Sequence, residues 1–169
     1  MHIKPKNYHR KSMRLQGYDY TFPGAYFVTM VTQLRECLFG EVVDSEMQVN
    51  QFGIIVDQAW MDLPSHYPQV TLEAFVVMPN HVHGIVVINE CRGGSQTRPY
   101  RMIQHGLPEI VRAFKSFSAM RINQLQKRDR VAVWQRSFYD HIIRNEQDFR
   151  NNWEYIHNNP QKWQDDEFH

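Results

Sequence analysis

Apolar and polar residues are arranged along the chain in two patterns, one typical of strands and one of helices. Five segments are rich in β-branched and aromatic residues and are bounded by turn-forming residues, which predicts strands. They span residues 25–32, 37–43, 72–78, 81–88 and 131–134. Pro79-Asn80 lies between the third and the fourth segment and predicts a turn. We therefore expect these two strands to form a hairpin.

Four other segments have the spacing or the boundary residues of helices. They span residues 50–63, 107–127, 140–145 and 147–158. Asn50 can cap the first helix, and Pro108 suits the first turn of the second, where its missing N–H is not needed. Pro64 and Pro160 end the first and the last helix. The predicted core-facing residues are Val111, Phe114, Ile122 and Leu125 on the long helix, with Ser118 as a polar gap, and Phe149, Trp153 and Ile156 on the last.

The order of these elements predicts the fold class. Strand, helix, two strands, helix and strand give a ferredoxin-like α+β fold, an antiparallel sheet with helices packed on one face, followed by C-terminal helices. A length of 169 residues suits one domain. We expect a single domain over residues 1–169, with a basic N-terminal arm at 1–16 and a flexible, solvated tail at 164–169.

A formal net charge of only +1 hides an uneven distribution. Residues 1–14 carry five basic and no acidic side chains, and residues 92–130 carry nine basic against two acidic ones. The rest of the chain is therefore acidic. Local charge governs affinity for phosphate groups, so these segments are candidate nucleic-acid contacts as well as ordinary solvated surfaces.

Cellular location is suggested by what the sequence lacks. Cys37 and Cys91 form neither a disulfide framework nor a CxxC metal motif. The N-terminus has no apolar stretch of the kind a signal peptide needs, and no run approaches the roughly 20 residues of a membrane span. We expect a cytoplasmic protein without a membrane partner.

His81 and His83 are the first candidate metal ligands. Residues i and i+2 of a strand point to the same face, about 7 Å apart at their Cα atoms. Two imidazoles at that spacing can bind one divalent cation, although packed or exposed histidines give the same pattern. Gly84 follows directly and allows close approach to the backbone.

A third ligand and a nucleophile are offered by the last predicted helix. Tyr155 and Asn159 are four residues apart and share one face, so the Asn159 amide can join the histidines while the Tyr155 hydroxyl points at the same centre. Tyr139 competes as the nucleophile. Its i+4 residue is Ile143, which cannot bind a metal, so we prefer Tyr155. Such a site suits phosphodiester transesterification by a tyrosine beside a divalent cation. The chain has no GxxxxGK[ST] loop, so no nucleotide cofactor is expected.

Several motifs together resemble one family. They are Tyr18-Asp-Tyr20, Gly24-Ala-Tyr-Phe-Val-Thr29, Leu38-Phe-Gly40, Val77-Met-Pro-Asn-His-Val-His-Gly84, Phe114-Lys-Ser116, Trp134-Gln-Arg-Ser-Phe-Tyr-Asp-His141 and Tyr155-Ile with Asn159-Pro160. The chain resembles the REP-associated tyrosine transposases, relatives of the single-tyrosine insertion-sequence transposases within the HUH endonucleases. The match covers roughly residues 10–163.

The resemblance implies a function and assigns roles to residues. It implies His81 and His83 as metal ligands, Asn159 as third ligand, Tyr155 as nucleophile and Mg²⁺ or Mn²⁺ as the cation. Relatives in the insertion-sequence branch have glutamine at the position of Asn159. The implied substrate is single-stranded DNA beside a hairpin, cleaved and rejoined through a 5′-phosphotyrosine intermediate. A homodimer and a monomer both fit the sequence, as does attack in either subunit.

DNA contacts are expected from the basic segments and from a short C-terminal motif. The candidates are Lys11, Arg14, Arg112, Lys115, Arg121, His141 and Arg144. Two other functions remain compatible with the same residues. One is a domesticated protein that binds hairpin DNA without cutting it, and the other is a metal-dependent hydrolase of small phosphoesters that uses water as its nucleophile.

Overall fold

A four-stranded antiparallel sheet in the order β4-β5-β1-β6 forms the framework of the protein. The computed structural model describes residues 17–90 and 105–169, and all structural statements concern these residues. The strands are β1 (Gly24–Val31), β4 (Val70–Val77), β5 (His81–Ile88) and β6 (Tyr139–Ile143). Strand β1, the first of the four along the chain, lies inside the sheet between β5 and β6, as in ferredoxin-like folds.

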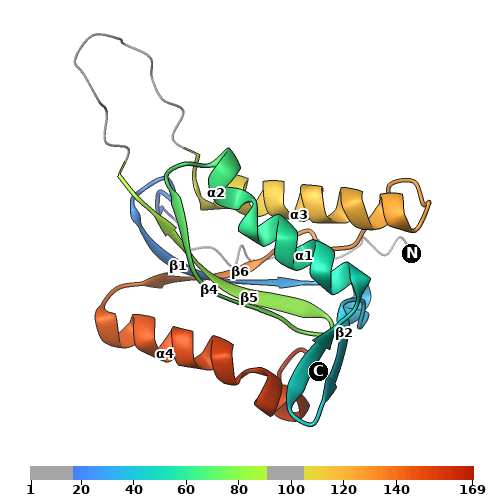
Figure 1. Cartoon of the computed structure of the whole chain (residues 1–169). Coiled ribbons are helices and arrows are strands. Elements are labelled where there is room, and N and C mark those ends of the chain that lie inside the picture. The colour runs from blue at the N-terminus through green and yellow to red at the C-terminus, as the bar shows by residue number, and fades with distance from the viewer. Residues whose placement is uncertain (1–16, 91–104) are drawn as a thin grey trace, which may run out of the picture.

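Three long helices enclose this sheet from two sides. Helices α1 (Gln51–Met61) and α3 (Leu107–Leu125) cover one face, and α4 (Glu146–Asn158) lies on the opposite side, against β4 and β5 (Figure 1). The predicted α+β fold is confirmed, with α4 adding a third layer. The short elements are η1 (Gln33–Arg35), β2 (Gly40–Val43), β3 (Glu46–Val49), α2 (Leu63–His66) and η2 (Pro160–Asp165). None of the helices in the described ranges is long and apolar enough to cross a membrane.

Local sequence explains where several elements begin and turn. The Asn50 side chain accepts hydrogen bonds from the backbone N–H groups of Phe52 and Gly53, and so caps α1 as predicted. Asp44 and Ser45 both have positive φ, of 50° and 66°, which is the backbone of a tight hairpin turn between β2 and β3. Strand β3 was not predicted. It pairs only with β2, in a small separate sheet.

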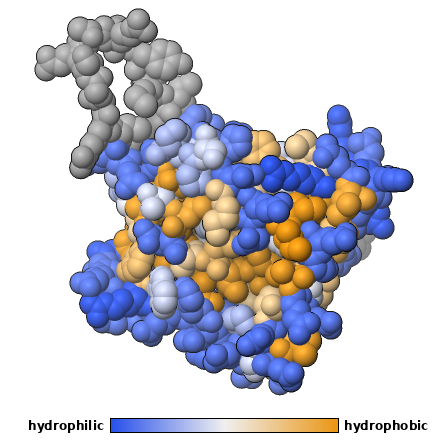
Figure 2. Space-filling view, viewed as in Figure 1, coloured by the Kyte–Doolittle hydropathy of each residue, from blue (hydrophilic) through white to orange (hydrophobic). Residues whose placement is uncertain are grey.

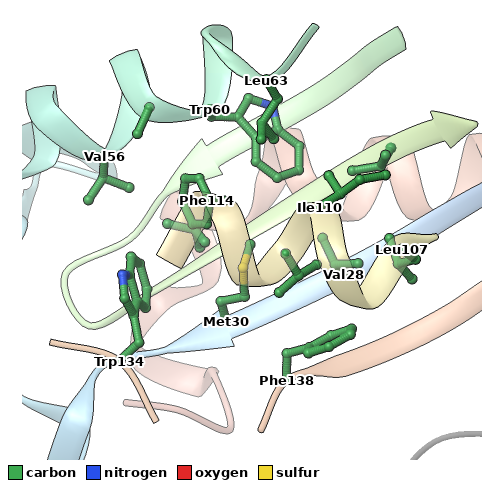
Figure 3. Close-up of a cluster of buried hydrophobic side chains, with 14 of the residues drawn as sticks. Val28, Met30, Val56, Trp60, Leu63, Leu107, Ile110, Phe114, Trp134 and Phe138 are labelled. Carbon is green, nitrogen blue, oxygen red and sulfur yellow. The ribbon is translucent and has the colours of Figure 1, made fainter. Parts of the chain in front are cut away.

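Large apolar side chains fill the layer between the sheet and helices α1 and α3. Trp60 stacks on Phe75 at 4.5 Å between ring centroids and meets the Phe114 ring edge-to-face at 5.6 Å. Val28 and Met30 point from β1 toward α3 in the same cluster (Figure 3). The viewed side of the surface shows apolar residues gathered between the α1–α2 helices and α4, where the sheet comes to the surface (Figure 2).

The polar gap predicted in the α3 stripe has a specific role. The Ser118 hydroxyl donates to the Phe114 carbonyl oxygen at 2.7 Å and accepts from the Trp134 indole N–H at 2.9 Å. A buried indole N–H needs such a partner. Leu125, predicted on the same stripe, is instead half exposed, as is Trp153 on α4.

Three expectations about the C-terminal third are wrong. Residues 140–145, predicted as a helix, belong mainly to strand β6, which pairs with β1. Residues 131–134, predicted as a strand, make a single bridge between Trp134 and Thr32. The tail at 164–169 is not free, because η2 extends to Asp165 and the Phe168 side chain is buried. The predicted basic arm at 1–16 lies outside the described residues.

Candidate metal centre and nucleophile

His81 and His83 lie side by side on β5, on the sheet face toward α4. Their exposed fractions are 0% and 1%, and their Nε2 atoms are 3.0 Å apart. The prediction that the two imidazoles share a face is therefore confirmed. Val82 between them points to the other face and is buried in the main core.

The Nδ1 atom of each imidazole makes a hydrogen bond to a neighbouring side chain. His81 Nδ1 is 2.8 Å from Asn80 Oδ1, and His83 Nδ1 is 2.7 Å from Thr29 Oγ1. Asn80 Nδ2 donates to the Phe168 carbonyl oxygen at 2.6 Å, which leaves Asn80 Oδ1 to accept from His81 Nδ1–H. In neutral His81 the lone pair is then on Nε2, facing His83. Such hydrogen bonds fix the tautomer that a metal ligand needs.

Burial keeps both imidazoles uncharged at neutral pH. It lowers the pKa of His81 to about 4, although nearby Asp166 and Asn159 oppose that shift. Burial also lowers the pKa of His83 well below its usual value, and the neighbouring His81 acts in the same direction. Neutral imidazole is the form that binds metals, so protons do not compete for these nitrogens near pH 7.

Asn159 lies at the C-terminal end of α4 and is 1% exposed. Its Nδ2 donates to Asp166 Oδ2 at 3.1 Å, while its Oδ1 has no hydrogen-bond partner among the described residues. A buried amide oxygen without a partner is unfavourable. The amide is close enough to His81 and Tyr155 to affect the pKa of both side chains.

Tyr155 lies one helical turn before Asn159 and beside the same imidazoles. Its ring centroid is 5.1 Å from that of His83 and 5.9 Å from that of Phe27. Burial raises the pKa of the Tyr155 hydroxyl, as do the negative charges of Asp166 and Glu167, and the Asn159 amide opposes them. The side chain is still 38% exposed, so it remains accessible to a substrate.

Tyr139 also lies near this site, on strand β6. On strand β6 it pairs directly with Thr29, whose hydroxyl contacts His83, and residues paired in this way share a face. Its ring centroid is 5.6 Å from that of Phe168, which also packs on His81. Tyr139 was ranked lower because Ile143, four residues later, cannot bind a metal. That argument assumes helical spacing and does not apply on strand β6.

Asp166 is a site residue that the sequence did not reveal. The ligand atoms of His81, His83 and Asp166 all lie within 4.8 Å of one another, and the three residues could hold a metal ion. The Asp166 side chain is only 2% exposed. Its position near the end of an acidic, polar segment predicted a solvated residue, and only the fold brings it to the histidines.

The predicted DNA contacts are scattered rather than gathered around the histidines. Arg121 bonds Asp62 at 2.8 Å. Lys115 Nζ donates to the carbonyl oxygens of Gln135 and Ser137 at 3.0 and 2.7 Å. His141 lies 2.9 Å from the Asp148 carboxylate, which also accepts from the Arg144 backbone N–H. His141 lies on strand β6 and Arg144 follows that strand, so neither is on the helix predicted over residues 140–145. Lys11 and Arg14 lie outside the described residues.

Arg112 helps to line a cavity in which a further basic side chain, that of Arg136, also lies. The cavity has a volume of about 490 Å³ and is lined by Pro108, Glu109, Val111, Arg112, Lys115, Arg136 and Phe138. Arg136 was not among the predicted contacts, although it lies within the motif around Trp134.

Comparison with known proteins relates this arrangement to a family. An uncharacterized protein of Haemophilus influenzae is 38% identical over 169 residues, which is 96% of this chain and 94% of that protein. A second H. influenzae protein, named as a candidate REP-associated tyrosine transposase, is 28% identical over 144 residues, covering 85% of this chain and 74% of that one. No protein-family model matches the chain.

Two solved structures share the fold. One is a REP-associated tyrosine transposase bound to a REP hairpin, with a TM-score of 0.56 and 22% identity over 89% of this chain and 74% of that one. The other is a candidate transposase of Deinococcus radiodurans, with a TM-score of 0.50 and 20% identity over 86% of this chain and 95% of that one. The chain is therefore similar in sequence and in fold to the REP-associated tyrosine transposases.

The side chains at this centre include several suitable metal donors. Two neutral imidazoles with facing Nε2 atoms and an amide oxygen without a partner are suitable ligands for a divalent cation. These residues therefore fit a metal ion. In this chain the C-terminal residues add a carboxylate to the set.

Proposed function

We propose that the protein is a metal-dependent single-stranded DNA endonuclease and strand transferase that acts at hairpin sequences through a covalent 5′-phosphotyrosine intermediate. The observation that carries the proposal is the convergence of two Nε2 atoms, 3.0 Å apart, beside the Tyr155 ring. Similarity to a REP-associated tyrosine transposase supports the DNA-processing chemistry, and a protein of the same fold is bound to a REP hairpin.

His81, His83 and Asn159 would hold Mg²⁺ or Mn²⁺. When bound, the cation would supply charge stabilisation to the scissile phosphate. Tyr155 would then attack phosphorus through its hydroxyl oxygen and release its proton. A bond forms between that oxygen and phosphorus, and the bond from phosphorus to the 3′ oxygen breaks. The 3′ oxygen takes up a proton and leaves as a free hydroxyl group. The phosphotyrosine bond preserves the phosphodiester for rejoining, so no nucleotide is needed.

The protonation state of Tyr155 limits this reaction. Its pKa is raised by burial and by the carboxylates of Asp166 and Glu167. The hydroxyl is therefore protonated at neutral pH, and a phenol is a weak nucleophile in that form. A cation beside the Asp166 carboxylate would offset the negative charge near the ring and favour loss of the proton.

The DNA backbone would be bound in part by the cavity that Arg112, Lys115 and Arg136 line with Phe138. Guanidinium groups pair with phosphates. A single-stranded segment leaving a hairpin offers such phosphates. A cytoplasmic location and a homodimer remain predictions of the sequence.

The test is formation of a covalent protein–DNA adduct. Wild-type protein is incubated with Mn²⁺ or Mg²⁺ and single-stranded DNA that contains the hairpin repeats flanking its own gene. We expect an adduct that survives denaturing electrophoresis and is lost in Tyr155→Phe but retained in the matched variant Tyr139→Phe. Loss in Tyr139→Phe with retention in Tyr155→Phe would move the nucleophile to β6.

A hairpin-binding protein without cleavage activity is the second candidate function. The observation in its favour is the burial of both imidazoles, at 0% and 1% exposure, beneath Phe168. A phosphodiester reaches the Nε2 atoms only if the C-terminal residues move. Tight hairpin binding with no adduct under either metal would support this alternative. Hydrolysis of a generic phosphodiester by Tyr155→Phe would instead indicate a hydrolase that uses water.

A further inference from the structure

The last residues of the chain are packed into the candidate metal centre. Residues 166–169, which we term the C-terminal turn, place Phe168 against His81, with 4.9 Å between ring centroids. The Phe168 carbonyl oxygen accepts from Asn80 Nδ2 at 2.6 Å, and the Glu167 carbonyl oxygen accepts from Arg35 at 3.0 Å. These bonds fix the turn at the edge of β5.

The C-terminal turn brings a carboxylate to the histidines. Asp166 Oδ2 is 4.0 Å from His81 Nε2 and accepts from Asn159 Nδ2 at 3.1 Å. Asp166 Oδ1 accepts from the Phe168 backbone N–H at 2.7 Å, so the side chain cannot rotate freely. Both oxygens are thus oriented by protein donors, and Oδ2 is the one that faces the imidazoles.

Within the described residues, no lysine or arginine lies within 4.0 Å of the Asp166 carboxylate. Its side chain is 2% exposed, and the only basic group within 4.0 Å among the described residues is His81. Burial keeps that imidazole neutral, and it offers a lone pair rather than a positive charge. A buried carboxylate is strongly unfavourable unless it is paired or coordinates a metal.

The spacing of the atoms suits a single ion. In an octahedron with bonds of about 2.1 Å, neighbouring ligand atoms are about 3.0 Å apart and opposite ones about 4.2 Å. The two Nε2 atoms are 3.0 Å apart, and the His81 Nε2 and Asp166 Oδ2 atoms are 4.0 Å apart. The first pair therefore has the separation of neighbouring ligands, and the second approaches that of opposite ones.

We propose that Asp166 is a protein ligand of the divalent cation, so that the C-terminal turn forms part of the metal centre. This inference rests on the proposed function, since it concerns the same ion. His81, His83 and Asn159 are all neutral donors, and Asp166 adds the one negative charge. The anionic oxygen increases affinity for a hard cation such as Mn²⁺ or Mg²⁺. It also lowers the net charge that the ion presents to a phosphate.

The experiment measures Mn²⁺ binding by the full chain without DNA. Free Mn²⁺ is titrated by electron paramagnetic resonance, because bound Mn²⁺ loses the sharp signal of the hydrated ion. We expect Asp166→Asn to weaken binding at least about tenfold, as loss of an anionic ligand should. Asp165→Asn is the matched control, with the same charge change at the exposed neighbouring residue, and should bind as wild type does.

Melting temperatures of Asp166→Asn and one further variant, Asp166→Glu, separate ligation from a structural role. Asp166→Asn keeps an oxygen that can accept from Phe168, so the metal-free melting temperature should stay within a few degrees of wild type. Its upward shift with Mn²⁺ should shrink. Asp166→Glu restores the carboxylate and should recover most of the affinity.

The possible failures are distinguishable. Equal Mn²⁺ affinity in Asp166→Asn and wild type, with affinity lost in His83→Ala, would overturn the role of Asp166 and leave the proposed function intact. Tighter binding in Asp166→Asn would overturn it as well, because the turn would then obstruct the ion. If wild-type protein neither binds Mn²⁺ nor forms the DNA adduct at the same Mn²⁺ concentrations, both proposals are overturned.

Discussion

The two faces of the central sheet differ in kind although the same strands form them. The face toward α1 and α3 is dry and apolar, with Trp60, Phe114 and Met30 fully or almost fully buried in one cluster. The face toward α4 has only a small apolar cluster, around Ile85 and Ile156. Beside that cluster it buries His81, His83 and Asn159, together with a carboxylate.

This difference shows how one strand supports folding and chemistry at once. Successive residues of β5 alternate between the faces, so Val82 and Val86 pack in the main core while His81 and His83 face α4. The large apolar face supplies the stabilisation that lets the smaller one carry buried polar groups. Substitutions on the two faces should therefore affect different measurements.

The largest expected effect is on the α4 face. His83→Ala removes one of the two facing Nε2 atoms, and we expect covalent adduct formation to fall at least about 10³-fold, with Mn²⁺ binding lost. Val82→Ala is the matched control on the neighbouring residue. It should reduce the free energy of unfolding by about 2 kcal/mol through lost apolar packing, and still form adduct. Equal loss of adduct in both variants would contradict the separation of the faces.

Acid should weaken the fold through the same histidines. The pKa of His81 is about 4 in the folded protein and that of His83 is well below its usual value, whereas both are near 6.5 when unfolded. Below pH 6.5 the unfolded chain binds protons that the folded one does not. The contribution of the two histidines to the free energy of unfolding is therefore fully present above pH 6.5. It decreases toward pH 4 by about 1.4 kcal/mol per pH unit for each histidine.

Urea unfolding of the metal-free protein between pH 4 and pH 7 measures this slope. His83→Gln should have a visibly shallower slope over the same range, because one of the two titrating groups is gone. A wild-type profile that is flat from pH 6.5 to pH 4 would mean that the imidazoles are not desolvated in the folded state.

A third prediction concerns the apolar face alone. An added Cβ at Gly84 would lie 2.5 and 2.6 Å from two atoms of the Trp60 ring, which is itself held between Phe75 and Phe114. Gly84→Ala should reduce the free energy of unfolding by about 2 kcal/mol without changing Mn²⁺ affinity. Combining it with Trp60→Phe should relieve part of the clash, so the two losses should be less than additive. Strict additivity in denaturant unfolding would show that the ring moves aside.

The sequence predicted the elements whose pattern is local and strong. The β-branched run of residues 81–88, after the turn signal at Pro79-Asn80, and the Asn50 cap needed no knowledge of the rest of the chain, and both are present in the structure. Strand β6 was misassigned because its residues, Tyr139-Asp-His-Ile-Ile143, alternate little in polarity. They become a strand by pairing with β1, and the Tyr20 hydroxyl bonds Asp140 on one side of it.

The residues of the candidate site also differ in whether local sequence predicts them. His81 and His83 are neighbours in sequence, and Tyr155 with Asn159 lie one helical turn apart, so spacing alone suggests each pair. Asp166 could not be found in that manner. Its burial depends on bonds from the C-terminal turn to Asn80 and Arg35, which are far away in the sequence. A short acidic segment has no local signal that distinguishes a buried ligand from a solvated one.

The smallest expected effect tests how far the DNA extends over the helical layer. Arg121 on α3 was predicted to contact DNA, but its guanidinium bonds Asp62 at 2.8 Å, in a pair whose side chains are 39% and 46% exposed. Surface pairs of this kind contribute about 0–1 kcal/mol. Arg121→Gln should therefore change the free energy of unfolding by less than about 1 kcal/mol and leave hairpin affinity unchanged.

Arg136→Gln is the comparison for that variant, because Arg136 lines the cavity beside Phe138 and should contact phosphate. Its hairpin affinity should fall several-fold at low salt. The slope of log affinity against log salt concentration should decrease in magnitude by about one, because one fewer counterion is released. Binding isotherms at several salt concentrations measure both variants. If Arg121→Gln and Arg136→Gln lose affinity equally, the DNA must extend beyond the cavity to the C-terminal half of α3, where Arg121 pairs with Asp62.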